Sequence, residues 1–463
     1  MGKVTFYGAC GCVTGSCTHL RWGDTQILVD CGMYQGSDEL DQRNWDPFEF
    51  TPSDLDAVVL THAHLDHSGL LPKLAARGFT GPIYCTRPSR GLVSLILLDA
   101  GKIQEEQARY ALKKGYSRYK DPKPLYTSED ANEALKLVQP LPFDQEREIL
   151  PGIRICYRRA GHLLGAANVS ITAKGSDGER RTWLFSGDVG RYGVPILKDP
   201  VSPDLVPDAL LLESTYGDRL HEESNPKEEL NKIIQETFAR RGTVVIPAFA
   251  LGRSQEMLYY LAELATEGQI DPATVFLDSP MAVKATRVYD AAVGEHDEEL
   301  QELDDLVDPL AKDVFQHCST VSQSKALNSR RQPAVIISAS GMATAGRVVH
   351  HLAHHLPDER ASVVLVGYQA SGTRGRALQD GADTVSIHGR RVRVRAQIHT
   401  LAGLSAHADR RELRRWCAGL PGKARRLFLN HGEENARKAL AAVLEEDGWP
   451  RAVLPFLGDS VPW

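Results

Sequence analysis

Short apolar runs of strand length recur through the first part of the chain, separated by turn residues and helical stretches. Polar residues repeatedly follow these runs, which is how open sheets carry their functional sites. The strands predicted in this part are residues 3–7, 25–30, 57–60, 82–85, 152–157, 169–172, 182–188 and 209–213.

The pattern changes from about residue 216 to residue 395, where strands alternate with longer helices. Residues 243–247 form one such strand, and Met257, Leu258, Leu261 and Leu264 then recur on one helical face. Two similar units start at residues 335–338 and 362–367, so we expect a parallel α/β domain. Residues 405–409 and 427–433 return to the opening pattern, which predicts that the middle domain is inserted into the first.

The composition fits a two-domain globular protein. The chain has 463 residues, of which 42% are hydrophobic and 25% are charged. The net charge of −6 excludes the strongly basic field of a nonspecific nucleic-acid coat, so any nucleic-acid contact should be local. The eight cysteines are irregularly spaced, so no disulfide framework is expected. Cys10, Cys12 and Cys17 are expected to be buried, reduced thiols, with a metal site as the alternative.

No targeting segment is indicated at the N-terminus, which starts on a predicted strand without an apolar leader. The longest apolar run, residues 92–98, is far short of the roughly 20 residues that cross a bilayer. We therefore expect a cytoplasmic protein without a membrane partner.

One segment concentrates metal-binding side chains: residues 61–69 read THAHLDHSG directly after the apolar run 57–60. His62 and His64 alternate on an extended segment and therefore point the same way. The turn through Asp66 and His67 presents two more donors to a neighbouring ion. Imidazole together with carboxylate favours zinc, with manganese or iron as alternatives.

Two ions need more ligands than this cluster holds, and three single residues at predicted strand ends could supply them. These residues are His162, Asp188 and His431. Each of them alone could cap a turn or satisfy backbone groups. Their joint presence indicates a binuclear metal site.

The string THAHLDHSG, followed by His162 and Asp188, resembles the metallo-β-lactamase superfamily. Glu213 in LLESTYG, His407 in SAH and His431 in HGE are similar to the three extra motifs of its β-CASP nucleases. The segments PAFALGR, DSPMA and SGM, at residues 247–253, 278–282 and 340–342, also resemble that family. The His in the third extra motif resembles the RNA-processing members, including the endonuclease subunit of the cleavage and polyadenylation specificity factor and its short prokaryotic relatives.

The resemblance implies an α/β fold, an αββα metallo-β-lactamase sandwich with an inserted parallel-sheet β-CASP domain. The sandwich would comprise residues 1–214 and 397–463, and the inserted domain residues 215–396. It also implies two Zn²⁺ ions per chain, with Mn²⁺ as the alternative. The implied ligands are His62, His64 and His162 for one ion and Asp66, His67 and His431 for the other, with Asp188 bridging.

The implied activity is hydrolysis of single-stranded RNA, as an endonuclease, with 5′–3′ exonuclease action left open. Asp66 and Asp188 would hold the ions that drive attack on the phosphodiester. His407 is the candidate proton donor to the leaving oxygen, with Glu213 as its carboxylate partner. The alternative for this pair is a buried hydrogen bond that only joins two domains. Asp30, which ends a strand, is expected to orient a ligand rather than to bind metal.

Substrate contacts are expected mainly from the middle domain, acting as a lid. Phosphate would be held where helices begin, by Arg253, Ser340, Gly341, Met342 and Arg347. Arg391, Arg393 and Arg395 alternate along one predicted strand and would form a local positive track for RNA. An edge strand protected by arginine is the alternative.

Four histidines, His350, His351, His354 and His355, lie at helical spacing without a companion acid or cysteine. We expect them to form an exposed helix face rather than a metal site.

Three other functions compete with an RNA hydrolase. They are a single-stranded DNA nuclease, a hydrolase of thioesters or lactams, and a nonenzymatic RNA-binding subunit with a decayed site. A small substrate would need neither a phosphate lid nor the Glu213–His407 pair, and the complete ligand set argues against decay. The family resemblance alone also leads us to expect that the protein can form a homodimer.

Overall fold

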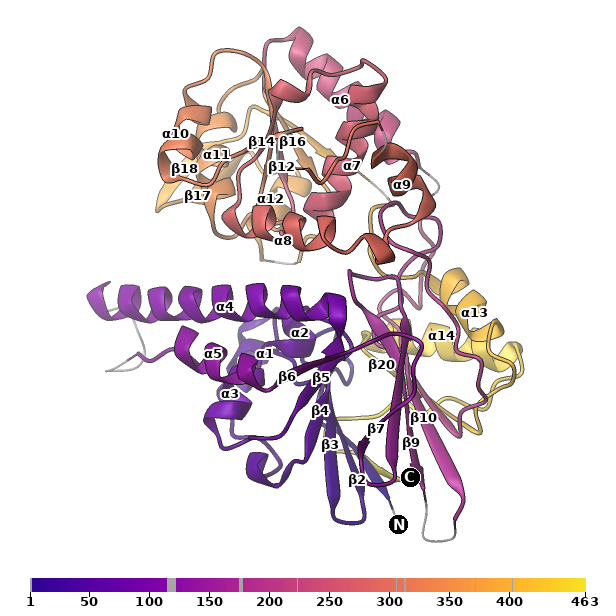
Figure 1. Cartoon of the computed structure of the whole chain (residues 1–463). Coiled ribbons are helices and arrows are strands. Elements are labelled where there is room, and N and C mark those ends of the chain that lie inside the picture. Colours follow the sequence, from indigo (N-terminus) through magenta and orange to yellow (C-terminus); the bar gives the residue numbers. More distant parts are fainter. Residues whose placement is uncertain are drawn as a thin grey trace. The chain divides into compact units, whose positions relative to one another are not determined.

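The computed structural model of the chain describes residues 2–114, 122–174, 178–222, 224–304, 306–311, 314–370, 372–401 and 403–463, which include every candidate site residue. The chain divides into two compact units. The first contains Met1–Gly193, Asp199–Leu220 and His407–Trp463, and the second contains Val194–Lys198 and His221–Ala406. The second unit is therefore inserted between two parts of the first (Figure 1).

The first unit is built on two sheets. The first sheet has the order β21 (Ser460–Pro462), β1 (Lys3–Phe6), β2 (Thr18–Trp22), β3 (Thr25–Val29), β4 (Ala57–Val59), β5 (Ile83–Thr86), β6 (Val138–Leu141). The second has the order β20 (Arg426–Asn430), β11 (Ala209–Glu213), β10 (Arg180–Phe185), β9 (Ala167–Lys174), β8 (Ile153–Arg159), β7 (Arg147–Leu150).

Alternation along the strands explains why this unit has four layers. On β10, Trp183 and Phe185 join the core between the two sheets, whereas Leu184 joins a separate core with Leu413 and Trp416 of α13. Side chains of a strand point alternately to opposite faces, so an all-apolar strand must be covered on both sides. Helices therefore pack outside each sheet, giving the predicted αββα sandwich.

The helices of the first unit lie before and after the inserted segment. They are α1 (Asp38–Arg43), η1 (Pro52–Asp54), α2 (Leu65–Ser68), α3 (Leu71–Ala76), α4 (Arg87–Lys114), α5 (Ser128–Lys136), α13 (Arg410–Ala418) and α14 (Glu434–Glu446). Within the described residues, none of the helices is long and apolar enough to span a membrane.

The second unit contains a six-stranded parallel sheet, as the strand and helix alternation predicts. Its order is β14 (Gln316–His317), β13 (Val275–Leu277), β15 (Ala334–Ser338), β12 (Thr243–Pro247), β16 (Ser362–Leu365), β19 (Gln397–Thr400). A separate antiparallel hairpin pairs β17 (Thr384–Ile387) with β18 (Arg390–Arg393). The helices are α6 (Pro226–Ala239), α7 (Arg253–Thr266), η2 (Pro272–Thr274), α8 (Pro280–Asp290), η3 (Val293–Glu295), α9 (Glu298–Asp304), α10 (Val321–Asn328), α11 (Arg347–His355) and α12 (Arg374–Gln379).

A buried carboxylate ties several elements of the second unit together. Asp278, which directly follows β13, is fully buried. It accepts hydrogen bonds from Ser324 Oγ at 2.5 Å, from the Arg347 guanidinium at 2.6 Å and from His351 Nε2 at 2.6 Å. These donors come from α10 and α11, so one side chain fixes two helices against the sheet.

The expected exposed histidine face on α11 is wrong for two of its four members. His351 and His355 are buried, while His350 and His354 are exposed. The helix is amphipathic, and positions 351 and 355 fall on the same side as the buried Val348 and Leu352.

Replacing Asp278 by Ala should lower the free energy of unfolding of the second unit by about 3 kcal/mol or more, because it leaves buried donors and the Arg347 charge without their acceptor. Urea unfolding followed by circular dichroism measures this change. Asp380→Ala is the matched control, since Asp380 pairs with Arg376 on an exposed surface and should change stability little. Equal unfolding curves for the two variants would contradict the structural role of Asp278.

Candidate metal centre

The polar residues singled out in the sequence gather at one edge of the sandwich because they follow the carboxyl ends of similarly directed strands. β3 runs parallel to β4, and β10, β11 and β20 run parallel to one another. β8 shares the direction of β10, since both are antiparallel to β9. The residues that follow or end these strands are Asp30 (β3), His62 to His67 (β4), His162 (β8), Asp188 (β10), Glu213 (β11) and His431 (β20).

The short helix α2 is held in place by backbone contacts with the loops beside it. Cys31 N donates to His67 O and Met33 N to Leu65 O, each at 2.8 Å, and Ser16 N donates to Asp66 O at 2.7 Å. Gly32 is required at this approach, because a Cβ there would lie 1.7 Å from Asp66 O. The positions of Asp66 and His67 are therefore fixed by the main chain.

Four donor atoms converge in a first group formed by His62, His64, His162 and Asp188. His64 Nδ1 lies 3.1 Å from His62 Nε2 and 3.2 Å from His162 Nε2. Asp188 Oδ2 lies 3.5 Å from His62 Nε2 and 3.6 Å from His162 Nε2. Tetrahedral zinc with bonds of about 2.0 to 2.1 Å separates its ligands by about 3.3 Å, so these four atoms fit one zinc ion.

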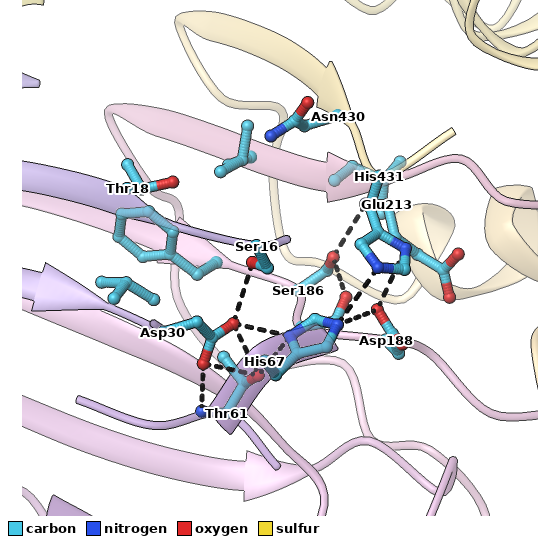
Figure 2. A pocket seen from close by; sticks show the side chains of 15 residues that line it. Ser16, Thr18, Asp30, Thr61, His67, Ser186, Asp188, Glu213, Asn430 and His431 are labelled. Atoms are coloured by element: carbon cyan, nitrogen blue, oxygen red, sulfur yellow. Dashed lines mark hydrogen bonds and ion pairs between the residues drawn. The ribbon is translucent and has the colours of Figure 1, made fainter. Parts of the chain in front are cut away.

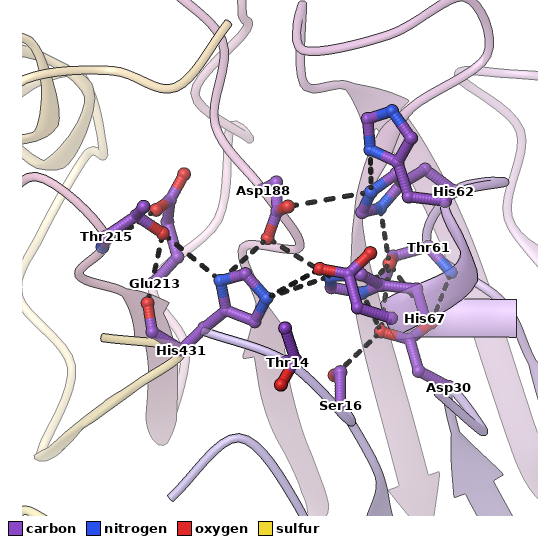
Figure 3. A network of polar contacts seen from close by, with 12 residues as sticks. Thr14, Ser16, Asp30, Thr61, His62, His67, Asp188, Glu213, Thr215 and His431 are labelled. Atoms are coloured by element: carbon purple, nitrogen blue, oxygen red, sulfur yellow. Dashed lines mark hydrogen bonds and ion pairs between the residues drawn. The ribbon is translucent and has the colours of Figure 1, made fainter. Parts of the chain in front are cut away.

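A second group lies on the other side of Asp188 (Figure 3). His67 Nε2 and His431 Nε2 are 3.1 Å apart, and Asp66 Oδ2 lies 4.0 Å from His67 Nε2 and 3.5 Å from His431 Nε2. Asp188 Oδ1 lies 3.4 Å from His67 Nε2 and 3.4 Å from His431 Nδ1. Among the described residues Asp188 Oδ1 has no hydrogen-bond partner, although it is buried. One carboxylate thus faces two groups of imidazoles, one oxygen to each.

The protonation states suit metal binding by the first group. Burial lowers the pKa of His62 well below its usual range, and it also lowers the pKa of His64. Both imidazoles are therefore neutral and keep a free lone pair at neutral pH. Burial raises the pKa of Asp66, which belongs to the second group, but the neighbouring imidazoles of His431, His67 and His64 together outweigh burial and lower the pKa to about 2. The carboxylate is therefore ionised.

Asp30 contacts the back of His67 rather than the converging donor atoms. Its Oδ2 lies 2.7 Å from His67 Nδ1, while its Oδ1 accepts hydrogen bonds from Thr61 N at 2.8 Å and Thr61 Oγ1 at 3.0 Å. Ser16 Oγ donates to Asp30 Oδ2 at 3.1 Å. The His67 ring is therefore oriented with Nε2 toward the second group.

His407 and Glu213 are in contact, within the first unit. His407 Nδ1 lies 3.3 Å from Glu213 Oε1 and 3.9 Å from Asp188 Oδ2. Burial alone would lower the pKa of His407, but the carboxylates of Glu213 and Asp188 outweigh it and raise the pKa to about 9. Glu213 itself is buried and accepts further hydrogen bonds from the backbone N–H groups of Val189 and Thr215. The imidazole is thus a proton carrier held beside the donor groups.

A small cavity of about 30 Å³ lies behind the second group (Figure 2). Asp30, His67, Asp188 and His431 line it together with side chains from both sheets, including Ser186. This volume suits one or two ordered water molecules, which could hydrogen bond the polar walls.

Sequence reasoning assigned no role to three residues that contact the site. Thr61 Oγ1 lies 3.2 Å from His62 Nδ1 and 3.3 Å from His67 Nδ1, and so touches one ring of each group. Thr215 Oγ1 lies 3.2 Å from His431 Nδ1, and Ser16 contacts Asp30. Thr61 and Thr215 lie inside quoted motifs, where a hydroxyl next to a ligand is a usable signal. Ser16 carries no comparable signal.

The residues predicted to bind phosphate all lie in the second unit. Arg253 begins α7 and pairs with Glu256, and Arg347 begins α11 and is bound to Asp278, Cys318 O and Ser319 O. Ser340, Gly341 and Met342 follow β15. Their role stays a prediction.

The alternative that Cys10, Cys12 and Cys17 bind a metal is wrong. All eight cysteines are free thiols, and no group of converging donor atoms in the described ranges contains a cysteine. Burial raises the pKa of Cys10 to about 12, so this thiol stays protonated.

Family models match most of the chain. The metallo-beta-lactamase superfamily matches residues 10–230, the Beta-Casp domain residues 254–378, and the Zn-dependent metallo-hydrolase RNA specificity domain residues 391–454.

Curated relatives match over nearly the whole length. Ribonuclease TTHA0252 of Thermus thermophilus is 38% identical over 99% of this chain and 100% of its own. The transcription termination factor FttA of Methanocaldococcus jannaschii is 33% identical over 94% of this chain and 67% of its own. A solved structure of a protein of unknown function from Enterococcus faecalis shares the fold, with a TM-score of 0.55, 12% identity and 99% coverage of both chains. The chain therefore belongs to the β-CASP ribonucleases of the metallo-β-lactamase superfamily, which makes it a metal-dependent hydrolase.

Proposed function

We propose that this protein hydrolyses phosphodiester bonds of single-stranded RNA with two zinc ions, chiefly as an endonuclease. The observation that carries the proposal is the placement of Asp188 between two groups of imidazole donors. The RNA specificity domain matched at residues 391–454 supports RNA as the substrate class. The proposed domains are residues 1–214 with 397–463, and 215–396, whereas the compact units of the structure change at residues 220/221 and 406/407.

In this proposal His62, His64 and His162 would hold one ion and Asp66, His67 and His431 the other, and Asp188 would contribute to both sites. Two zinc ions bound there would activate water and neutralise charge on the phosphodiester. Asp30 and Thr61 orient His67 through its Nδ1 side, which leaves Nε2 free for metal.

His407 donates the proton that the leaving oxygen of RNA requires. Two observations support this role: Glu213 holds Nδ1 of its ring, and the raised pKa keeps the ring protonated at neutral pH. With Nδ1 engaged, Nε2 carries the proton to be transferred. Glu213 acts as a positioning residue, fixed by two backbone N–H groups.

The metal assignment predicts that a chelator abolishes cleavage of end-labelled single-stranded RNA and that added zinc restores it. His64→Ala should remove cleavage as well, because His64 Nδ1 lies within 3.2 Å of two other donors of the first group. Electrophoresis of the labelled products measures both effects and separates internal cuts from 5′–3′ trimming.

The same assay is also run with single-stranded DNA and with a thioester, the substrates of the two alternative hydrolase functions. His354→Ala, which changes an exposed histidine of the second unit, is the matched control and should cleave normally. Cleavage that survives chelator or the His64→Ala change would refute the metal mechanism. Preference for DNA or the thioester would refute the RNA assignment.

The acid assignment predicts that His407→Ala lowers kcat by about 10²-fold or more while zinc content and the unfolding curve stay unchanged. The reason is that His407 contacts Glu213 and lies beside the donor atoms without belonging to either complete group. Single-turnover kinetics with metal analysis measures this. A His407→Ala protein with full zinc content and the wild-type cleavage rate would refute the role of His407 as the acid. A lower stability with an unchanged cleavage rate would instead favour a structural role for His407.

The β17–β18 hairpin offers the local positive charge that the net charge of −6 does not. Arg391, Arg393 and Arg395 are exposed, whereas Val392 and Val394 between them pack against the core of the second unit. Within the described ranges none of the three arginines forms an ion pair with a carboxylate. We propose that this face binds RNA backbone, with protection of an edge strand as the alternative.

Changing Arg391, Arg393 and Arg395 together to Gln should make the salt dependence of RNA binding shallower by about 2 in the slope of log K against log salt. Binding is measured by fluorescence anisotropy in the His64→Ala background. The matched control changes Arg154, Arg360 and Arg414, which are all paired with carboxylates; Arg360 and Arg414 are exposed and Arg154 is half-buried. An unchanged slope in the first variant would favour edge protection.

A further inference from the structure

Three loops of the second unit meet at the carboxyl edge of its parallel sheet. β15, β12 and β16 are neighbours in that order and all run in the same direction. The loops that follow them, residues 339–342, 248–252 and 366–369, therefore lie at one edge. In open α/β sheets this is where ligands bind.

Two of these loops each expose one aromatic side chain. Phe249 is 42% exposed although every other residue from 244 to 251 is buried. Tyr368 is 59% exposed and is the one exposed residue of the stretch 361–370. A large aromatic ring open to water at the end of a buried strand loses the burial that normally stabilises it. Phe249 and Tyr368, on loops at one edge of the sheet, are therefore a candidate contact surface.

The Phe249 ring is held rigidly by glycine backbone. A Cβ at Gly341 would lie 2.8 Å from ring atom Cδ2, so the ring packs directly on that glycine. A Cβ at Gly367 would lie 3.7 Å from ring atom Cε2. Gln369 Nε2 donates to the carbonyls of both glycines, at 3.1 and 3.0 Å, and so fixes the two loops relative to each other.

The backbone of Phe249 is also fixed, because Ser254 donates to its carbonyl through N at 3.1 Å and through Oγ at 2.7 Å. The three loops contain no Asp or Glu. A rigid ring on a surface without negative charge can accept an anionic strand whose bases present flat faces. Base stacking on aromatic side chains is the usual way in which single strands are bound without sequence preference.

We propose that Phe249, with Tyr368 beside it in the sheet order, is a stacking platform for unpaired RNA bases. The inference rests on the proposed function and deepens it, because it assigns base contacts to a unit for which only phosphate contacts were predicted. Gly341 links the proposed base contact to the predicted phosphate contact, since it belongs to the predicted phosphate-binding segment and also supports the Phe249 ring. A nucleotide bound there would place its base on Phe249 and its phosphate near residues 340–342.

The experiment compares Phe249→Ala with the zinc-loaded wild-type protein on short single-stranded RNA. KM should rise about tenfold, which is within the range expected for loss of one stacked base. Hydrolysis of bis(p-nitrophenyl) phosphate, a diester without bases, should keep the wild-type kcat/KM. Phe249→Trp should restore a near wild-type KM, because it keeps a stacking face.

Two controls isolate the stacked base. Phe456→Ala removes another exposed phenylalanine, 72% exposed in the first unit, and should leave KM for RNA unchanged. A set of RNAs with one abasic position each should contain a position at which wild-type and Phe249→Ala proteins have the same KM, since the base that stacks is missing there.

The outcomes distinguish failure of the stacking platform from failure of the proposed RNA hydrolysis. If the wild-type protein cleaves RNA and Phe249→Ala does so with the same KM, the platform is refuted and the RNA activity stands. A rise in KM that is identical for every abasic RNA would also refute it, because the side chain would then act without a base. If the wild-type protein cleaves no RNA, both the activity and the platform fail.

Discussion

The candidate site depends on one buried carboxylate. Asp188 lies at the end of a central strand, almost without solvent contact, and each of its oxygens points into a different group of imidazole nitrogens. A buried negative charge costs several kcal/mol unless positive charge lies against it. The fold places histidines from both sheets around this carboxylate, and those with a raised pKa, His67 and His407, set positive charge against it. The converging donor atoms also suit metal cations, in keeping with the match to a Zn-dependent metallo-hydrolase domain.

Sequence periodicity was enough for most of the sheet framework, because the central strands are buried on both faces. Residues 57–60, 209–212 and 335–337 are continuous apolar runs, and the corresponding strands lie at those positions. The strand β2 (Thr18–Trp22) was missed, since His19 and Arg21 interrupt its apolar pattern. β13 was also missed, since its apolar run comprises only residues 275–277, one residue fewer than the run at 57–60. The local sequence pattern therefore detects strands with a continuous apolar run. Strands without such a run form because they pair with neighbouring strands, which the local pattern does not reveal.

The residues of the candidate site also divide into those that the sequence reveals and those that it does not. The compact HAHLDH cluster and the histidines and carboxylate at strand ends are visible in the sequence because metal ligands are chemically distinctive. Their mutual distances were not, since residues such as His67 and His431 meet although 364 positions separate them in the sequence. The exposure of His351 and His355 was mispredicted, because the spacing of polar residues on a short helix reveals neither the buried face of α11 nor the acceptor Asp278 that contacts His351. Phe249 was quoted within a motif, but only the structure shows that its ring is uncovered.

Strand pairing between the two ends of the chain has a consequence for how the molecule is made. β1, at residues 3–6, pairs with β21, at residues 460–462, and His431 arrives on β20 after the whole second unit. During synthesis the edge of the first sheet at β1 therefore stays unpaired while the inserted unit is made. That unit is a nearly continuous segment of some 180 residues, which can fold before the C-terminal strands are synthesised. The candidate site is incomplete until His431 has been synthesised, so a product that ends before this residue lacks one of the converging donor side chains.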